Sequence, residues 1–242
     1  MIRPIFPWHD RPGLAGGVDK DGSRAAELLA LGFASVEVGS VMPAAAPAVA
    51  ATLAAGAAAR GGAVGVGLGL PAEMPVDRLR ESWLAGLAAL WQVANYLSFN
   101  LSAAANSRFL VPEQWPRLAL ACRAAAFQRD CWAAESGRHL PLALKLPLGK
   151  CGEALPAAAS IAAAAGFDLL TVVLPDEAGR FERLAELARN LDDGPALVAV
   201  GGIRSALDVV AARQAGAAGV QVHRLFVEQG PACLATLLRS TT

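Results

Sequence analysis

The stretch "VAVGGIRSALDVVAARQAGAAGVQVHRLF", residues 198–226, decides the fold. It opens with a short apolar run, passes through two glycines, and continues as a helical pattern from Ser205 to Gly216. Serine is a common helix N-cap, and glycine is typical of the position just past a helix C-terminus. A second apolar run, 218–222, follows at once. This order predicts a βαβ unit with two parallel strands.

The same alternation extends through the chain. Helical patterns separate the apolar runs, and in the pattern over 76–94 the side chains of Leu79, Trp83, Leu87 and Leu90 share one face. The runs are rich in valine and leucine, and they predict eight strands, at 13–18, 34–39, 63–69, 96–101, 141–146, 168–174, 197–201 and 218–222.

Eight strands that alternate with helices in 242 residues are typical of a single (β/α)8 TIM barrel. A doubly wound open sheet is the alternative, although it rarely needs eight such units in a row. No linker or charge run divides the chain, so we expect one domain over 1–242. The alanine-rich segment 44–60 fits either one helix or a lid loop that contains a helix.

Composition limits the partners and the compartment. Lysine plus arginine and aspartate plus glutamate each total 21, so net charge favours neither nucleic acid nor a membrane surface as a partner. The N-terminal stretch 1–13 lacks the apolar core of a signal peptide, and no run of about 20 residues is apolar enough to span a bilayer. Four scattered cysteines form no CxxC pair, which argues against a zinc knuckle. We therefore expect a cytoplasmic protein without a metal site.

In a (β/α)8 barrel the ligand site lies at the carboxyl ends of the strands. The loops after strands seven and eight commonly bind phosphate, and the Gly201-Gly202 turn would let backbone amides approach an anion. His223 and Arg224 follow the eighth strand. His223 is either a proton acceptor or a hydrogen-bonded structural residue.

Four other polar residues stand out at predicted strands. Lys145 lies inside an apolar strand, where a lysine is costly unless it faces an anion or a pocket. Asn100 ends a strand and would suit a planar heterocycle. Lys20 is either a second cation aimed at the same place or a solvated lysine paired with a neighbouring aspartate. Glu37 either pairs with a cation on the helix side or lies in the barrel core.

Several segments together resemble the dihydroorotate dehydrogenases. "GLAGGVDKDG" (13–22) is similar to the first-strand motif of that family, and "GFASVEVGSVMP" (32–43) is similar to its second-strand motif. "YLSFNLS" (96–102) and "LPLALKLP" (140–147) resemble the fourth and fifth strands. The stretch 198–226 resembles the seventh and eighth. The resemblance spans about 12–230.

This resemblance implies a barrel that binds FMN and, in the family, oxidises dihydroorotate to orotate with a serine or cysteine as base. The family's soluble members also suggest a homodimer. Lys20 would lie between flavin and substrate, and Arg224 would replace a hydroxyl as a phosphate ligand. The candidate cofactor-binding residues are Gly16, Gly17, Lys20, Ser40, Asn100, Lys145, Gly201, Gly202, His223 and Arg224.

The sequence departs from the family pattern mainly at the substrate positions. Ala103 stands where the base is expected, and an alanine accepts no proton. Ala105 replaces a substrate-binding asparagine unless Asn106 shifts into its place, and Val173 and Leu174 replace a polar pair after the sixth strand. We therefore expect a flavin-binding barrel that has lost dihydroorotate oxidation. The alternatives are a non-catalytic pseudoenzyme that binds a protein or metabolite, and a flavin-free enzyme for a phosphorylated substrate.

Overall fold

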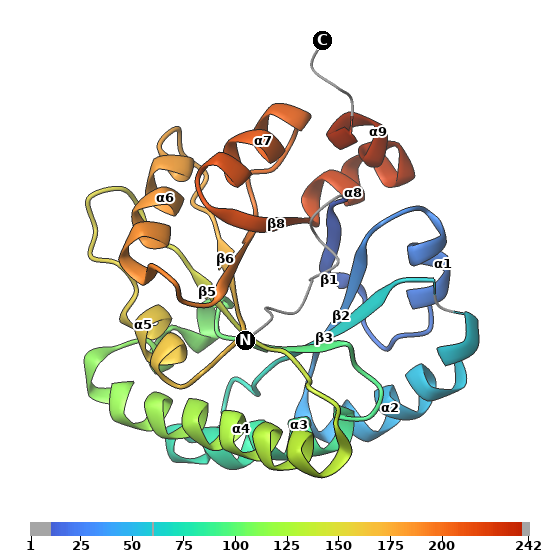
Figure 1. Cartoon of the computed structure of the whole chain (residues 1–242), viewed down its shortest axis with the longest axis vertical. Coiled ribbons are helices and arrows are strands. Elements are labelled where there is room, and N and C mark those ends of the chain that lie inside the picture. Colours follow the sequence, from blue (N-terminus) through green and yellow to red (C-terminus); the bar gives the residue numbers. More distant parts are fainter. Residues whose placement is uncertain (1–10, 60, 239–242) are drawn as a thin grey trace.

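The structure, a computed structural model, describes residues 11–59 and 61–238. The N-terminal segment 1–10, for which the sequence predicts no signal peptide, lies outside the described residues. Eight parallel strands form one closed barrel, and helices surround it (Figure 1). The strands are β1 (Gly13–Asp19), β2 (Ser35–Val41), β3 (Ala63–Leu68), β4 (Tyr96–Asn100), β5 (Leu142–Pro147), β6 (Leu169–Val173), β7 (Ala196–Val200) and β8 (Ala217–Val222).

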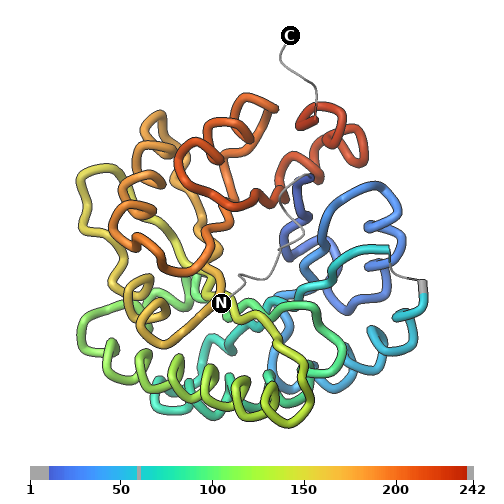
Figure 2. The backbone as a smooth tube through the Cα atoms, in the orientation of Figure 1, coloured from blue at the N-terminus to red at the C-terminus, as the bar shows by residue number. Residues whose placement is uncertain are grey.

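Closure of the sheet confirms the predicted (β/α)8 barrel and excludes the open sheet. The closing pair joins Gly13 to Gln221 and Leu14 to Val222. Figure 2 shows this closure as the dark blue β1 lying beside the orange-red β8. Every strand boundary lies within two residues of its predicted position.

The helices form the outer layer. In α3, the predicted face of Leu79, Trp83, Leu87 and Leu90 is buried. The alanine-rich segment 44–60 contains helix α2 with a short 3-10 turn on each side, and Arg60 lies outside the described residues. The helices are α1 (Ala25–Ala30), α2 (Ala46–Ala55), α3 (Leu79–Leu90), α4 (Trp115–Ser136), α5 (Ala157–Ala164), α6 (Arg180–Leu191), α7 (Ala206–Gln214), α8 (Arg224–Gln229) and α9 (Cys233–Leu238).

The barrel interior is filled by side chains. Tyr96, Ala143, Leu169 and Val198 pack together there as one small buried cluster. Gly65 makes room for the tyrosine, because a Cβ atom at this position would lie 1.9 Å from Cζ of Tyr96. The interior therefore forms a solid floor below the carboxyl ends of the strands.

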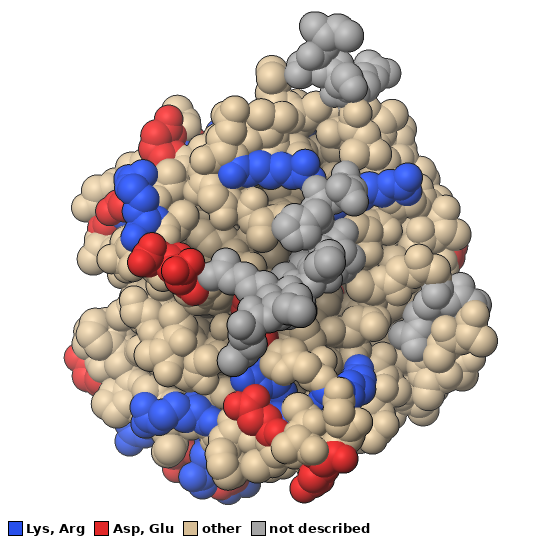
Figure 3. Space-filling model, viewed as in Figure 1, with Lys and Arg blue, Asp and Glu red and all other residues tan. Residues whose placement is uncertain are grey.

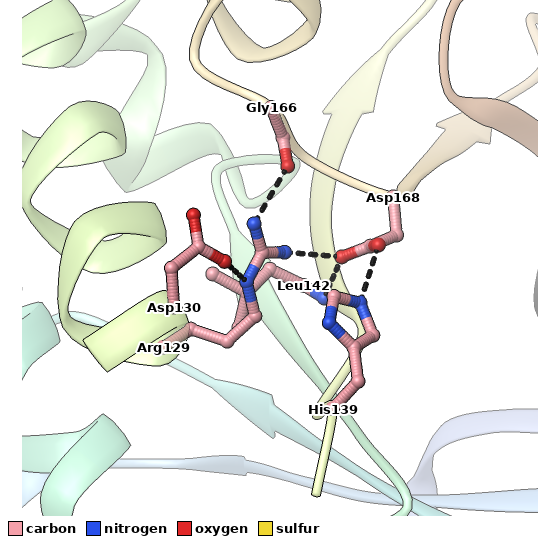
Figure 4. A network of polar contacts seen from close by, with 6 residues as sticks. All are labelled: Arg129, Asp130, His139, Leu142, Gly166 and Asp168. Carbon is pink, nitrogen blue, oxygen red and sulfur yellow. Dashed lines mark hydrogen bonds and ion pairs between the residues drawn. The ribbon is translucent and has the colours of Figure 1, made fainter. Parts of the chain in front are cut away.

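A polar network ties α4 to the amino ends of β5 and β6 (Figure 4). Asp168, just before β6, accepts hydrogen bonds from Arg129 Nη1 at 2.6 Å and from the Leu142 amide at 2.9 Å, and contacts His139 Nε2 at 2.7 Å. Arg129 also donates to the Gly166 carbonyl at 3.1 Å and to Asp130 at 2.6 Å. Since polar networks at this end of a barrel are usually structural, we assign it to stability.

None of the helices in the described ranges combines the length and the apolar character that crossing a bilayer requires.

Candidate functional site

A cleft of about 330 Å³ opens at the carboxyl ends of β5 to β8 and beside β1. This volume lies in the range of small-molecule sites, and the position is where (β/α)8 barrels bind ligands. The cleft has a polar floor, a glycine turn and a charged rim. Its lining residues are Ala15, Gly16, Lys145, Val173, Leu174, Asp176, Val200, Gly201, Gly202, Ile203, Arg204, Gln221, Val222, His223, Arg224, Leu225 and Glu228.

Lys145 supplies a cation to the floor of the cleft. Its side chain is 9% exposed, and Nζ lies 3.2 Å from Oε1 of Glu37. Glu37 is buried inside the barrel, so the structure selects the core position from the two that the sequence left open. It also accepts a hydrogen bond from Tyr96 at 3.3 Å.

The Gly201-Gly202 turn forms one wall. Both glycines have positive φ, 84° and 67°, a conformation that other residues adopt only with strain. Within the described part of the chain, the amides of Gly202 and Ile203 have no backbone acceptor. Two hydrogen-bond donors therefore stand beside the cleft.

Neighbouring side chains hold this turn in place. Ser205 caps α7 by accepting from the Asp208 amide at 3.2 Å. Asp208 in turn accepts from Arg204 N at 2.9 Å and from Arg180 at 2.6 Å. Because the Arg180 side chain packs against Gly202, a Cβ atom there would lie 2.9 Å from its Cδ. The cap and the arginine therefore fix the backbone around the donors.

Two arginines and an aspartate occupy the rim. Arg204 lies 2.6 Å from one oxygen of Asp176, and Arg224 lies 3.7 Å from the other. All three side chains are more than half exposed. These ion pairs are therefore weak, and an incoming anion could exchange with the carboxylate.

His223 lies between the rim and β1. Burial lowers its pKa below the ordinary value of 6.5, and the positive charges of Lys145 and then Arg224 lower it further. Its ring packs against Gly17, where a Cβ atom would lie 2.8 Å from Nε2. The imidazole is therefore mainly neutral at pH 7 and is suited to accept a hydrogen bond.

The cleft contains six of the ten candidate cofactor-binding residues, namely Gly16, Lys145, Gly201, Gly202, His223 and Arg224. Gly17 is next to its lining and contacts His223.

The other three candidates, Lys20, Ser40 and Asn100, are not among the lining residues. Asn100 donates to Ser40 Oγ at 2.7 Å, and its Oδ1 accepts from the Ser102 amide at 3.0 Å. Lys20 is exposed on a turn that Asp19 shapes by accepting from the Gly22 amide at 2.9 Å. Burial raises the pKa of Asp19.

The loop after β4 carries the alanines at the expected base and substrate positions. Ala103 and Ala105 are exposed, and neither is among the residues that line the cleft. Asn106 is buried, and its Nδ2 donates to the Asn100 carbonyl at 2.9 Å. Val173 and Leu174 do line the cleft, so the wall contributed by β6 has an apolar surface.

The sequence pattern did not single out four polar lining residues: Asp176, Arg204, Gln221 and Glu228. The first three lie at or just beyond the carboxyl end of a predicted strand, and this position was the available signal. The chain is thus a (β/α)8 barrel protein whose cleft, at the carboxyl ends of its strands, carries cations and backbone amides that have no backbone acceptor among the described residues.

Comparison with known proteins identifies the relatives of this barrel. The chain is 26% identical over 280 residues to the dihydroorotate dehydrogenase (quinone) of Bordetella pertussis, covering 94% of this chain and 80% of the relative. It is 28% identical over 276 residues to the enzyme of the same name from Methylococcus capsulatus, with 94% and 81% covered. No family model matches the sequence.

Solved structures of dihydroorotate dehydrogenases are similar to this barrel in fold. The ligand-free dihydroorotate dehydrogenase of Eimeria tenella superposes with a TM-score of 0.78 at 20% identity, covering 98% of this chain and 87% of that one. This likeness concerns the fold. In sequence, the chain is similar to dihydroorotate dehydrogenases over 94% of its length.

Figure 3 shows one face of the molecule, with acidic and basic side chains interspersed around it rather than gathered into one patch.

Proposed function

We propose that this protein binds FMN in the cleft and does not oxidise dihydroorotate. The observation that carries the proposal is the continuity of one cavity from Lys145 to the Gly201-Gly202 turn, while alanines occupy the loop after β4. The features that favour flavin are thus retained, and those that would serve the substrate are missing.

The donor set fits the two ends of FMN. The amides of Gly202 and Ile203 and the guanidinium groups of Arg204 and Arg224 suit a phosphate. Lys145, at the other end of the cleft, suits an acceptor on a flavin ring. The glycines at 16 and 17 leave β1 without side chains that would obstruct the ring. We propose Lys20, Ser40 and Asn100 as further contacts on the side of β1, β2 and β4.

FMN, when bound, supplies two-electron chemistry to this cleft. The chain's own residues bind and orient it. Arg204 and Arg224 neutralise the phosphate, and Lys145 donates a hydrogen bond to the ring. The apolar Val173 and Leu174, beside Gly201, would exclude water from that wall of the cleft.

Loss of dihydroorotate oxidation follows from the chemistry of the loop after β4. A general base contributes roughly 10²–10⁴ in rate, and Ala103 cannot act as one. A polar ring placed against Val173 and Leu174 would leave hydrogen-bonding groups unpaired, each at a cost of about 1–3 kcal/mol. A smaller or less polar substrate fits this wall better.

A second candidate function is a non-catalytic binding scaffold. The observation that favours it is that the cations of the cleft already have partners in the chain. Lys145 pairs with Glu37, and both rim arginines pair with Asp176. In this case the cleft would bind FMN weakly or not at all.

Titration of FMN with the purified protein, monitored by flavin fluorescence, distinguishes the proposed FMN-binding function from the non-catalytic scaffold. We expect saturable binding that weakens at least about tenfold in Lys145→Met, because a hydrogen bond from a charged donor is worth about 1.5–3 kcal/mol. The matched control is Lys150→Met, since Lys150 lies outside the cleft lining and should leave the affinity unchanged. Equal affinities in the two variants would refute the proposed site.

A separate assay tests the proposed loss of dihydroorotate oxidation. Dihydroorotate is offered with excess FMN and a soluble quinone, the acceptor class named for the relatives, and orotate is measured. We expect no turnover above the background of free FMN. Orotate formation at an enzyme-like rate, on the order of 1 s⁻¹ or more, would contradict the proposal.

A further inference from the structure

A buried charge pair crosses the barrel interior beneath the cleft. Glu37 comes from β2 and Lys145 from β5, and the ammonium lies 3.2 Å from Oε1. The Glu37 side chain is 2% exposed. The pair belongs to the floor of the site, yet Glu37 is not among the residues that line the cleft.

The carboxylate is held from its other side by neutral donors. Tyr96 OH donates to Oε2 at 3.3 Å, and Gln221 Nε2 donates to Tyr96 OH at 2.9 Å. Burial and the Glu37 charge raise the pKa of Tyr96 well above 10, so the phenol stays protonated. Because a carboxylate only accepts, the direction of each hydrogen bond in this chain is fixed.

The carboxylate lies close to the glycine backbone of β1 and β3. A Cβ atom on Gly16 would lie 3.1 Å from Oε1 of Glu37, and one on Gly67 would lie 3.2 Å from the same oxygen. This oxygen also accepts from Lys145. The glycines of β1 and β3 therefore let the carboxylate sit against the backbone, with Oε1 facing the ammonium.

Within the described ranges, Lys145 keeps donors for a ligand. Glu37 is the one hydrogen-bond acceptor of Nζ there, so two of the three ammonium hydrogens have no acceptor among those residues. The side chain also lines the cleft. A ligand at the floor therefore meets a donor whose charge is already balanced from below.

We propose that Glu37 is a positioning residue that fixes Lys145 and cancels its charge at the floor of the cleft. Such a floor favours a neutral acceptor, such as a carbonyl or ring nitrogen of a heterocycle, over an anion. For FMN this means that Glu37 lowers the preference for the reduced, negatively charged ring relative to the oxidised, neutral ring. This inference rests on the proposed FMN site.

The test compares the full-length protein with Glu37→Gln, a variant that keeps the side-chain shape and removes the charge. Affinities for oxidised and reduced FMN are measured anaerobically, and the midpoint potential is measured by dye equilibration. We expect the ratio of reduced to oxidised affinity to rise about tenfold in Glu37→Gln, which is a positive shift of about 30 mV for two electrons. An unchanged ratio overturns the proposal.

Two further variants separate charge from packing. Tyr96→Phe keeps the ring against Gly65 and removes one hydrogen bond to Glu37, so it should change the ratio less than about twofold. Glu37→Asp keeps the charge but withdraws the carboxylate, and a smaller positive shift is expected. If Glu37→Gln does not fold, the aspartate variant decides the question, because an unchanged ratio there contradicts positioning.

A readout without flavin distinguishes failure of this inference from failure of the proposed function. Acetylation of Lys145 by a small anhydride is followed by peptide mass spectrometry, with Lys150 as internal reference. Without the carboxylate, Nζ of Lys145 loses the ion pair that holds it against β2 and is freer to reach the anhydride from the cleft, so acetylation should be several-fold faster in Glu37→Gln. If wild type binds no FMN and this acceleration is seen, the proposed function fails and the positioning role stands. Equal rates would overturn the positioning role.

Discussion

His223 shows how its surroundings set the chemistry of a single residue. Its ring is partly buried against Gly17, and two cations, Lys145 and Arg224, act on it. Burial and both charges disfavour the imidazolium. The sequence left open whether this histidine is a base or a structural residue, and these surroundings favour an uncharged hydrogen-bonding group at pH 7.

The first prediction at this scale concerns pH. The folded-state pKa of His223 lies below 6.5, so the unfolded chain binds the proton more readily. The stability that neutral His223 contributes is present above about pH 6.5 and is lost as pH falls through the folded pKa. A histidine NMR titration should place His223 below 6.5, and Arg224→Ala should raise the value. Titration of His223 at or above 6.5 would contradict this electrostatic picture.

A second prediction concerns Asp176, which pairs with both rim arginines. Removing its charge in Asp176→Asn should tighten FMN binding by up to about fivefold, since exposed pairs of this kind are worth about 0.2–1 kcal/mol. Fluorescence titration at low salt measures the change. Asp192→Asn is the matched control, because Asp192 is an exposed residue just after α6, at the amino-terminal side of the barrel. Weaker binding in Asp176→Asn would show that the carboxylate supports the site.

The sequence did not predict which charged residues pair with each other in the cleft. Lys145 could be identified as a candidate because burying a lysine in an apolar strand is costly unless it faces an anion or a pocket. Its partner could not be assigned, since Glu37 lies 108 positions away and only barrel closure brings the two together. Asp176 carried only the signal of its position just beyond a predicted strand, because a loop aspartate there otherwise resembles any solvated residue.

At the scale of elements, the sequence was far more informative. Short valine- and leucine-rich runs placed the strands, because strands buried on both faces need continuous apolar residues. Gly216 and Ser205 marked the ends of α7 for reasons of backbone geometry. The sequence did not predict the partners of Asn100, whose side chain donates to Ser40 Oγ and accepts from the Ser102 amide. Side-chain partners of this type depend on how neighbouring strand ends meet.

The element-scale prediction tests the network that joins α4 to β5 and β6. Asp168→Asn leaves Arg129, whose side chain is 5% exposed, without its principal counter-charge. Breaking a buried pair typically costs about 3–5 kcal/mol, and partial exposure of Asp168 reduces this to about 2–4 kcal/mol. Urea unfolding measures the loss. Asp130→Asn is the control, because its carboxylate pairs with the same guanidinium but is 61% exposed, and it should cost less than about 1 kcal/mol.

If the two variants lose equal stability, the buried pair of Arg129 and Asp168 does not stabilise the barrel more than the exposed pair of Arg129 and Asp130. If Asp168→Asn folds normally but binds FMN more weakly, the amino ends of the strands would be coupled to the cleft, which the assignment to stability does not allow.

At the scale of the whole molecule, the barrel separates two tasks. The amino ends of β5 and β6 are tied to the outer helix by the Asp168 network, and the carboxyl ends of β5 to β8 form the cleft. The dihydroorotate dehydrogenases that this chain resembles share this scaffold. The departures from their pattern on which the proposed function rests lie in the loop after β4 and at the end of β6, so the proposed change of substrate would need no change of fold.

The measurement that tests the account most directly is the visible absorbance spectrum of the purified protein after incubation with FMN and gel filtration. The account predicts a flavin absorption band that elutes with the protein in stoichiometric amount. Lys145→Met should retain clearly less. A protein fraction without flavin absorption at saturating FMN would contradict the proposed function and favour the binding scaffold.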